Sequence, residues 1–377
     1  MAADPVEIAR GLIRCRSVTP TEGGAQAFLA DILKGAGFEV HRVKFSEPGT
    51  PDVENLFAKI GSGSPHLAFA GHTDVVPPGD ESRWTHPPFA GELKDGVLYG
   101  RGAVDMKGAI ASFVAAAIEH GKPKGTISLL ITGDEEGPGI NGTKKLLEWA
   151  KARGEKFDAC IVGEPTSVER VGDTLKIGRR GSLSATLTVS GKQGHAAYPQ
   201  RADNPMPALL RALNALGEPL DKGSEHFEPS NLEITSLDVG NPAFNVIPAE
   251  AKARFNVRFN DRFTSASLKK LIEERIAKAA QRARYQLVYE PASESYLTKP
   301  GPFVALVQKS VAEAAGVKAE ASTSGGTSDA RFIKDYCAVV DIGLGGGGMH
   351  AVDESVPVED LRTLQKIYGR ILANYFA

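Results

Sequence analysis

Five short polar clusters in this chain of 377 residues combine histidines with carboxylates. Four of them directly follow runs of apolar residues, and the fifth opens a helical stretch. The candidate ligands in these clusters and their acidic neighbours are His72, Asp74, Asp105, Glu135, Glu136, Glu164 and His350. Imidazole and carboxylate ligands together suit Zn²⁺ and its first-row neighbours. The types and positions of these residues therefore predict a metal site.

Each cluster by itself has a simpler explanation. An aspartate at the start of a helix, such as Asp105, is often a cap. Adjacent carboxylates such as Glu135 and Glu136 usually lie in a solvated turn, because their repulsion disfavours burial unless a cation lies between them. A histidine after a strand is usually an ordinary surface residue. The joint occurrence of all five clusters at the ends of elements favours the metal site over five separate coincidences.

The elements that must position these residues alternate between strand and helix. Four apolar runs lack polar alternation, as do strands that are buried on both faces. These runs span 67–71, 126–132, 159–163 and 338–343, and the helical stretches around them span 108–120, 142–153, 303–315 and 359–375. Such alternation predicts an α/β domain with a sheet between helices. Ligands of such a sheet bind beyond the carboxyl ends of its strands, where the clusters fall.

A different pattern occupies residues 181–294, where apolar and polar residues alternate as in half-exposed strands. The alternating segments span 184–190, 231–239, 251–259 and 285–289, and the helical segments span 205–216 and 265–283. The order strand, helix, strand, strand, helix, strand predicts a ferredoxin-like α+β domain. This domain would be inserted into the α/β domain, which then comprises residues 1–180 and 295–377. Its free strand edges or helices lead us to expect a homodimer.

The composition excludes several classes of protein. Lys and Arg number 44 and Asp and Glu 46, with no basic block, so neither nucleic acid nor an anionic membrane is an expected partner. We expect no membrane span and no export signal, since the apolar runs are short and the N-terminus lacks a charged segment followed by an apolar one. Three widely spaced cysteines fit reduced thiols in a cytoplasmic protein.

His195 lies inside the inserted domain, far in sequence from the other candidates. Small residues surround it in the segment 191–199 (GKQGHAAYP), which is typical of a turn. The pattern alone leaves its role open between a turn residue and a catalytic group. The other histidines lack any such context, and we interpret them as surface or structural residues: His41, His66, His86, His120 and His226.

The motifs GHTDVVPPGD, GRGAVDMKG, GDEEG, GEPT and the late MH together resemble those of the dinuclear-zinc aminoacylase and carboxypeptidase family of amidohydrolases. The resemblance extends over essentially the whole chain, and it is strongest to members that act on succinylated diaminopimelate. It implies a helix–sheet–helix catalytic domain with an inserted dimerisation and lid domain, and two Zn²⁺ per subunit, for which Co²⁺ is a possible substitute. The implied reaction converts N-succinyl-LL-2,6-diaminopimelate to succinate and LL-2,6-diaminopimelate in lysine and diaminopimelate biosynthesis.

Carried over by position, the resemblance also implies the ligand set. His72 and Glu164 would be terminal ligands of different zinc ions, and Asp105 would bridge both ions. Glu136 would complete the coordination of one ion and His350 that of the other. The family also tends to place a cis peptide after the bridging residue, here between Asp105 and Met106.

The resemblance implies three further roles near the metals. The Asp74 carboxylate would hydrogen-bond the His72 imidazole, and Glu135 would be the general base. A histidine from the partner subunit's inserted domain would stabilise the oxyanion, and His195 is the matching position. Domain closure would bring that histidine to the site.

The implied substrate carries several carboxylates, which arginines bind well. The positions that match substrate contacts of the family are Arg179, Ser182, Asn245, Arg258, Gly326 and Thr327, of which Asn245 would reach across the dimer. The glycine run 345–348 departs from the family, whose members usually carry larger or polar side chains there. Related enzymes therefore stay open as alternatives, namely an acetylornithine deacetylase-like deacylase or a metallo-carboxypeptidase. A module without activity is disfavoured, because it would not need Glu135.

Overall fold

The computed structural model of the protein describes residues 3–377, which form two compact units. The second unit comprises Gly178–Leu297 together with Thr323–Thr327, and the first contains the rest of the described chain. The second unit thus begins at 178 rather than 181 and ends at 297 rather than 294. It also includes Thr323–Thr327, which the sequence assigned to the other domain. The guanidinium of Arg179 ties this segment to the second unit, because its Nη1 donates to the carbonyl of Gly326 at 3.1 Å.

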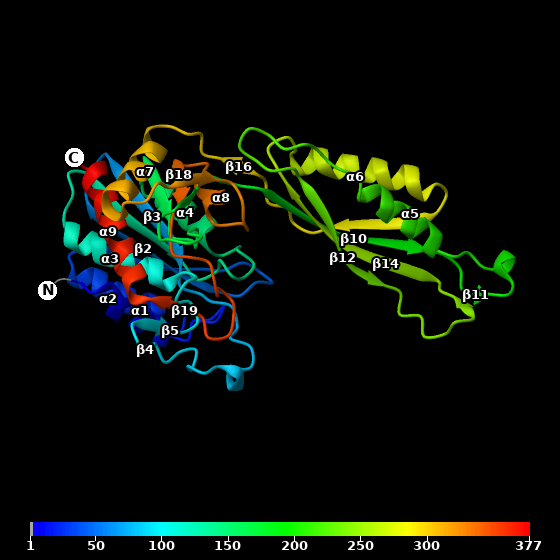
Figure 1. The fold of residues 1–377 in the computed structure, drawn as a ribbon, viewed down its shortest axis with the longest axis horizontal. Helices are drawn as coiled ribbons and strands as arrows, with labels where there is room; N and C mark the ends of the chain where they lie inside the picture. The colour runs from blue at the N-terminus through cyan, green and yellow to red at the C-terminus, as the bar shows by residue number, and fades with distance from the viewer. Residues whose placement is uncertain (1–2) are drawn as a thin grey trace. The chain divides into compact units, whose positions relative to one another are not determined.

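An eight-stranded mixed sheet forms the centre of the first unit (Figure 1). In spatial order its strands are β1 (Glu39–Phe45), β2 (Val53–Gly61), β6 (Thr126–Thr132), β3 (His66–His72), β7 (Ala159–Val162), β18 (Ala338–Asp341), β8 (Thr174–Lys176) and β17 (Glu320–Ser322). The neighbours β6, β3, β7 and β18 run parallel. Every residue of β3, β6 and β7 is buried, which confirms that these apolar runs are interior strands.

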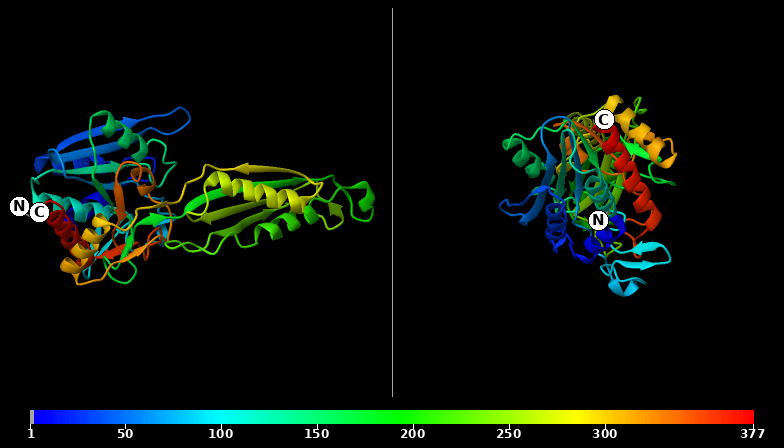
Figure 2. Two further views of the ribbon diagram at one scale, coloured as in Figure 1. Left: turned by 90° about the horizontal axis from the view of Figure 1, so that it is seen from above. Right: turned by 90° about the vertical axis from the view of Figure 1, so that its left-hand side faces the viewer.

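Helices lie on both sides of this sheet (Figure 2). In one group, α3 (Lys107–His120) packs between α1 (Pro5–Arg14) and α9 (Val358–Tyr375), and α9 also packs against α7 (Pro302–Ala315). Residues 107–117 of α3 are all buried, so this helix has no polar face to distinguish it from a buried strand. The other group contains α2 (Ala25–Gly35), which packs on β1 and β2, and α4 (Thr143–Ala152), which packs on β2, β6 and the short α8 (Ala330–Ile333).

The second unit has the predicted ferredoxin-like order. Its sheet runs β12 (Asn231–Asp238), β14 (Glu250–Phe259), β10 (Gly181–Ser190) and β15 (Arg284–Tyr289), and every neighbouring pair is antiparallel. The helices α5 (Met206–Leu216) and α6 (Ser265–Ala280) share one apolar core with β10 and β14. In β10 buried and half-exposed residues alternate strictly, because only one face of this sheet is covered.

Small elements complete the fold. The three-stranded sheet β4 (Glu92–Lys94), β5 (Val97–Tyr99) and β19 (Ser355–Pro357) lies in the first unit, where the single-turn helix η1 (Glu81–Arg83) also lies. In the second unit β9 (Gly178–Arg179) pairs with β16 (Tyr296–Leu297), β11 (Gly194–His195) pairs with β13 (Val246–Ile247), and η2 (Pro199–Arg201) follows β11. Within residues 3–377, no helix has both the length and the apolar character that a membrane crossing requires.

Candidate metal centre

The carboxyl ends of three adjacent parallel strands bring most of the candidate ligands together. His72 is the last residue of β3, which lies between β6 and β7. Glu164 follows β7 by two residues, and Glu136 lies in the turn that follows β6. Because parallel neighbours end at the same edge of a sheet, these side chains meet there, as the sequence predicted.

Asp105 reaches the same edge from the loop between β5 and α3. The predicted cis peptide between Asp105 and Met106 is present. The Met106 side chain lies over Gly71 of β3 and Gly163 after β7, and a Cβ atom added at either glycine would lie 2.7 Å from Met106 Cε. These two glycines, each just before a candidate ligand, therefore leave the space that lets the Asp105–Met106 turn approach the sheet.

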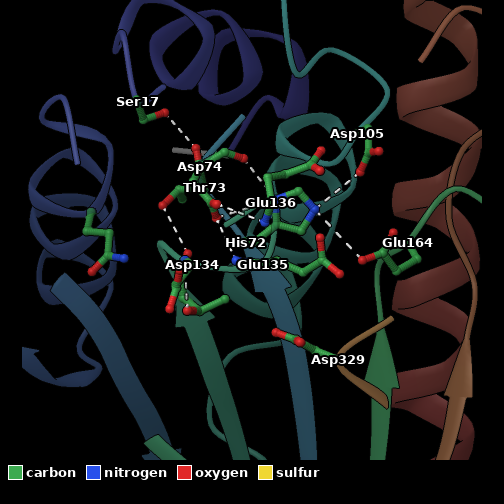
Figure 3. A network of polar contacts seen from close by, with 12 residues as sticks. Ser17, His72, Thr73, Asp74, Asp105, Asp134, Glu135, Glu136, Glu164 and Asp329 are labelled. Atoms are coloured by element: carbon green, nitrogen blue, oxygen red, sulfur yellow. Dashed lines mark hydrogen bonds and ion pairs between the residues drawn. The ribbon is translucent and has the colours of Figure 1, made fainter. Parts of the chain in front are cut away.

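The two carboxylate oxygens of Asp105 face two different histidines. His72 Nε2 lies 3.2 Å from Asp105 Oδ1, and His350 Nε2 lies 3.2 Å from Asp105 Oδ2. Glu164 Oε1 is 3.8 Å from His72 Nε2, while Glu136 Oε1 is 2.8 Å from His350 Nε2. Figure 3 shows the His72 ring directed at both Asp105 and Glu164.

Two sets of three ligands share Asp105. The inner set is His72, Asp105 and Glu164, and the outer set is His350, Asp105 and Glu136; the ligand atoms of each set lie within 4.8 Å of one another. The His72 side chain is 1% exposed and that of His350 is 48% exposed, so the outer set opens to solvent. Asp105 thus has the geometry of a bridging ligand.

The expected division of the ligands was wrong in one respect. The resemblance implied that His72 and Glu164 serve different ions, and that Glu136 and His350 do so as well. The structure instead groups His72 with Glu164 and His350 with Glu136. The sequence could not show this, because β6 and β7 both lie directly beside β3, so the order of the strands does not decide which carboxylate joins His72.

The Asp74 side chain also differs from its expected role. The His72 Nδ1 atom donates to the backbone carbonyl of Asp74 at 2.9 Å, whereas the Asp74 carboxylate is 3.7 Å away. That carboxylate instead accepts the backbone N–H groups of Glu135, at 3.3 Å, and Glu136, at 3.0 Å. Asp74 therefore holds the turn that carries the expected base and an outer-set ligand. Burial raises the pKa of Asp74 to about 6.

Glu135 lies against the ligands, since a carboxylate oxygen of Glu135 lies within 4.8 Å of ligand atoms of both His72 and Glu136. Burial raises the pKa of Glu135 to about 8, and the nearby carboxylates of Asp329 and Glu136 act in the same direction against the effect of His72. A carboxylate with a raised pKa is a stronger base than an exposed one. The position and environment of Glu135 therefore suit proton transfer.

The donor set fits divalent cations. A carbonyl oxygen only accepts, so the His72 Nδ1 that bonds to it must carry the proton. A neutral His72 then turns the lone pair of Nε2 toward the carboxylates of Asp105 and Glu164, an arrangement that is favourable with a cation between them. Without a cation the site holds a proton instead: although burial opposes it, Asp105 and Glu164 raise the pKa of His72. Hydrogen bonding to Asp105 likewise raises the pKa of His350 to about 9.

Five of the expected substrate contacts lie around the start of β10, in the second unit. Arg179 Nη1 bonds to Gly326 O, and Thr327 is the next residue after that glycine. Ser182 is the partner of Arg258 across the β10–β14 pair. Burial and the neighbouring guanidinium of Arg180 lower the pKa of Arg258. Two guanidinium groups so close together form an environment that suits an anion.

The remaining two predicted residues lie together beyond the other end of β10. His195 pairs with Val246 in the β11–β13 pair, and the next amide, Ala196 N, donates to Asn245 O at 2.9 Å. The His195 ring is exposed, and its Nδ1 accepts the N–H of Ala197 at 3.0 Å. Figures 1 and 2 show β11 beyond the end of the four-stranded sheet. The ten residues of β10 separate this pair from Ser182 by about 30 Å.

Sequence reasoning missed three buried charged residues beside the centre. Arg101 and Glu354 form an ion pair of 2.6 Å between the loops that carry Asp105 and His350. Asp329 is the strongest repulsive neighbour of Glu135. Arg101 lies within the GRGAVDMKG motif, so its position in the sequence indicated a place near the site. The positions of Glu354 and Asp329 in the sequence give no such indication.

Comparisons with known proteins agree with this architecture. The model of peptidase family M20/M25/M40 matches residues 68–374. The chain is 59% identical over 380 residues to a succinyl-diaminopimelate desuccinylase of Rhodopseudomonas palustris, which covers 99% of this chain and 98% of that protein. It is 57% identical over 389 residues to the protein of the same name from Nitrobacter hamburgensis, with 100% of both chains covered.

Solved structures of low sequence identity share the fold. A metallo-carboxypeptidase of the M20 family from Sulfolobus solfataricus superposes with a TM-score of 0.80 at 16% identity, covering 99% of each chain. A dinuclear metal-binding peptidase of the M20 family from Bacillus subtilis gives a TM-score of 0.70 at 16% identity, covering 99% of this chain and 97% of that one. The chain therefore belongs to peptidase family M20/M25/M40.

Proposed function

We propose that this protein hydrolyses the amide bond of N-succinyl-LL-2,6-diaminopimelate, releasing succinate and LL-2,6-diaminopimelate, with two zinc ions in each subunit. The observation that carries the chemistry is Asp105, whose two oxygens each lie 3.2 Å from a different histidine. The substrate rests on the full-length relatives at 57–59% identity that bear the name succinyl-diaminopimelate desuccinylase.

The inner set would hold one ion and the outer set the other, with Asp105 between them. When bound, a pair of divalent cations makes water more acidic and polarises an amide carbonyl. Glu135 accepts the proton of the attacking water and passes it to the leaving amine. Asp74 keeps Glu135 in place through the backbone of its turn, because its carboxylate accepts the N–H groups of Glu135 and Glu136.

Cationic groups of the second unit would recognise the carboxylates of the substrate. Arg258 is half-buried beside Arg180, and Arg179 is tied to the 323–327 segment. Planar guanidinium groups bind carboxylates through two parallel hydrogen bonds. The backbone and hydroxyl of Gly326 and Thr327 add neutral donors beside Arg179.

We also propose that the active form is a homodimer in which His195 acts on the substrate bound by the partner subunit. Within one inserted domain, the length of β10 separates His195 and Asn245 from Ser182 and Arg258. One small substrate spans far less than this distance, so a single insert cannot apply both groups to it. The edge strand β12 exposes Ile234 and Leu237, a feature that a second copy would cover.

A cytoplasmic location completes the proposal. Its support is the three free cysteines, of which Cys160 is buried and the other two are partly buried. Free thiols persist in a reducing compartment.

The decisive test compares acyl substrates and measures the metal. The purified protein should contain two zinc ions per chain and turn over N-succinyl-LL-2,6-diaminopimelate faster than N-acetylornithine or C-terminal dipeptides. Faster turnover of either competitor would assign it to the corresponding alternative, the deacetylase or the carboxypeptidase. Glu135→Gln should retain both ions and lose about 10²–10⁴-fold in kcat, the usual contribution of general base catalysis.

Mixing two inactive variants tests the dimer. Glu135→Gln and His195→Ala homodimers should both be nearly inactive. A mixed dimer contains one site with an intact Glu135 and a partner that supplies an intact His195, so activity should return after subunits exchange. If the mixture stays inactive although native mass spectrometry shows mixed dimers, His195 does not act across the subunits.

A further inference from the structure

The loops that carry Asp105 and His350 are joined by a buried ion pair. Arg101 follows β5 and Glu354 precedes β19, and these two strands are antiparallel neighbours. The Arg101 side chain is 2% exposed, the Glu354 side chain is fully buried, and Arg101 Nη1 lies 2.6 Å from Glu354 Oε2. The pair is therefore shielded from water and makes all its contacts within the first unit.

Glu354 binds the backbone that precedes the bridging ligand. Its Oε1 atom accepts the N–H of Val104 at 2.9 Å and that of Asp105 at 3.3 Å. Its other oxygen is occupied by Arg101. Glu354 thus fixes the main chain of Asp105 relative to β19.

Arg101 binds the backbone of the outer-set histidine. Its Nη2 atom donates to the carbonyl of His350 at 3.3 Å, and its Nη1 donates to that of Ala351 at 3.2 Å. The guanidinium also lies over the Trp84 ring, 5.1 Å from its centroid. The single ion pair therefore connects the main chain of Asp105 to the main chain of His350.

His350 needs such an anchor more than the inner-set ligands do. Its φ is +62°, a left-handed conformation that costs a residue other than glycine about 1 kcal/mol or more. The glycine run 345–348 before it supplies no side chains to pack. His72 and Glu164, in contrast, lie at or just beyond the ends of β3 and β7, which are hydrogen-bonded to each other.

Stability alone does not explain a buried ion pair, because an apolar pair of similar volume often stabilises a core as well or better. An apolar pair could not bind the N–H groups of Val104 and Asp105 or the carbonyls of His350 and Ala351. We propose that Arg101 and Glu354 are positioning residues that set the metal affinity of the outer set more than that of the inner set, because only the outer set contains His350, whose backbone Arg101 binds. This inference rests on the proposed two-metal function.

Glu354→Gln is the most selective variant. The amide oxygen of the new glutamine can still accept the N–H of Val104. Its NH₂ group, however, would face Arg101 Nη1, which is also a donor, so the hydrogen bond to Arg101 is lost. Arg101→Lys keeps the charge with a single donor group, so it should retain part of the effect. The matched control is Glu155→Gln, which breaks another ion pair of 2.6 Å, with Lys59, away from the ligands.

The two sets can be measured one at a time. In His350→Gln only the inner set is intact, so zinc binding measures the affinity of the inner set. In His72→Gln only the outer set is intact, so zinc binding measures the affinity of the outer set. Each demetallated, folded background is titrated with zinc against a chromogenic chelator, with and without Glu354→Gln. In the His72→Gln background Glu354→Gln should weaken binding at least tenfold, as losses of partners behind ligands usually do. In the His350→Gln background the loss should stay below threefold, and Arg101→Lys should give an intermediate loss in the outer set only.

Equal losses in both sets, or no loss in either, would overturn the inference, since a merely structural pair has no preference between them. Glu155→Gln should leave both affinities unchanged; a loss in that control equal to the loss in Glu354→Gln would also overturn it. If Glu354→Gln does not fold, Arg101→Lys gives the same comparison. Failure of the unaltered protein to bind two zinc ions would instead refute the proposed function, so the two failures are distinguishable.

Discussion

Replacing Asp74 by asparagine tests whether the turn that carries the base is held by a charged acceptor. The side chain is 1% exposed, and each of its oxygens accepts one N–H, from Glu135 and from Glu136. Asparagine offers one acceptor oxygen and turns an NH₂ group toward the second N–H. The lost hydrogen bond to a charged group is worth about 1.5–3 kcal/mol. If that loss appears in the transition state, kcat/KM falls roughly ten- to hundredfold.

The same substitution should make the metal-free protein less sensitive to pH. Burial raises the pKa of Asp74 from 3.8 to about 6, so the folded protein holds this proton more tightly than the unfolded chain. The resulting stability is fully present below pH about 4 and is lost as the pH rises to about 6 and beyond, by roughly 3 kcal/mol. Asp74→Asn should remove this component from urea unfolding of the demetallated protein.

Asp134→Asn is the matched control. Asp134 is also buried and lies in the same turn, but its Oδ2 accepts the N–H of Asn141 at 2.9 Å. We expect Asp134→Asn to change the free energy of unfolding about as much as Asp74→Asn does. Its kcat/KM should stay within about threefold of that of the unaltered protein. Equal kinetic losses in the two variants, or an Asp74→Asn enzyme with unchanged kcat/KM, would refute the argument that Asp74 positions the base.

Three further predictions concern the core of the first unit. Burial lowers the pKa of His66, so the stability of the protein should fall as the pH drops below about 6.5, and urea unfolding of His66→Asn should lack this loss. Gly163→Ala places a Cβ atom 2.7 Å from Met106 Cε and should lower the free energy of unfolding by about 1–3 kcal/mol, measured by thermal unfolding. The double variant with Met106→Ala should recover part of that loss. Burial raises the pKa of Cys160 and raises that of Cys337 to about 12, so a thiol reagent should label both slowly at pH 7.5 until the chain unfolds.

The sequence predicted the elements whose residues show an unambiguous pattern. The apolar run 126–132 is β6 to the residue, and the alternating segments of the insert became a ferredoxin-like sheet because one face is covered. The first sixty residues were not predicted. The strand β2 mixes Glu54, Asn55 and Lys59 with apolar residues, and the Nδ2 of buried Asn55 donates to the Asn141 carbonyl at 2.9 Å. Such partners distant in sequence are invisible to periodicity.

The candidate site shows the same limit. Residue types and strand ends predicted which candidate ligands meet, but not that Glu164 groups with His72 and Glu136 with His350, because β6 and β7 both lie beside β3. The resemblance implied that the Asp74 carboxylate hydrogen-bonds the His72 imidazole. That carboxylate instead accepts the backbone N–H of Glu136, in the turn that follows β6. Arg101 and Glu354 are 253 residues apart, and nothing local to either residue predicts the contact.

The glycine run 345–348 need not hold His350 by packing, because contacts of the following residues and of Arg101 fix the backbone of His350. Arg101 binds the carbonyl of His350, and Asp353 Oδ1 accepts the N–H groups of Thr85 and His86 at 2.8 and 3.2 Å. A Cβ atom at Gly347 would meet nothing within 4 Å, so that position is not constrained by packing. The position of the outer-set residue His350 therefore depends on the residues that follow it and on Arg101 rather than on packing of the glycine run.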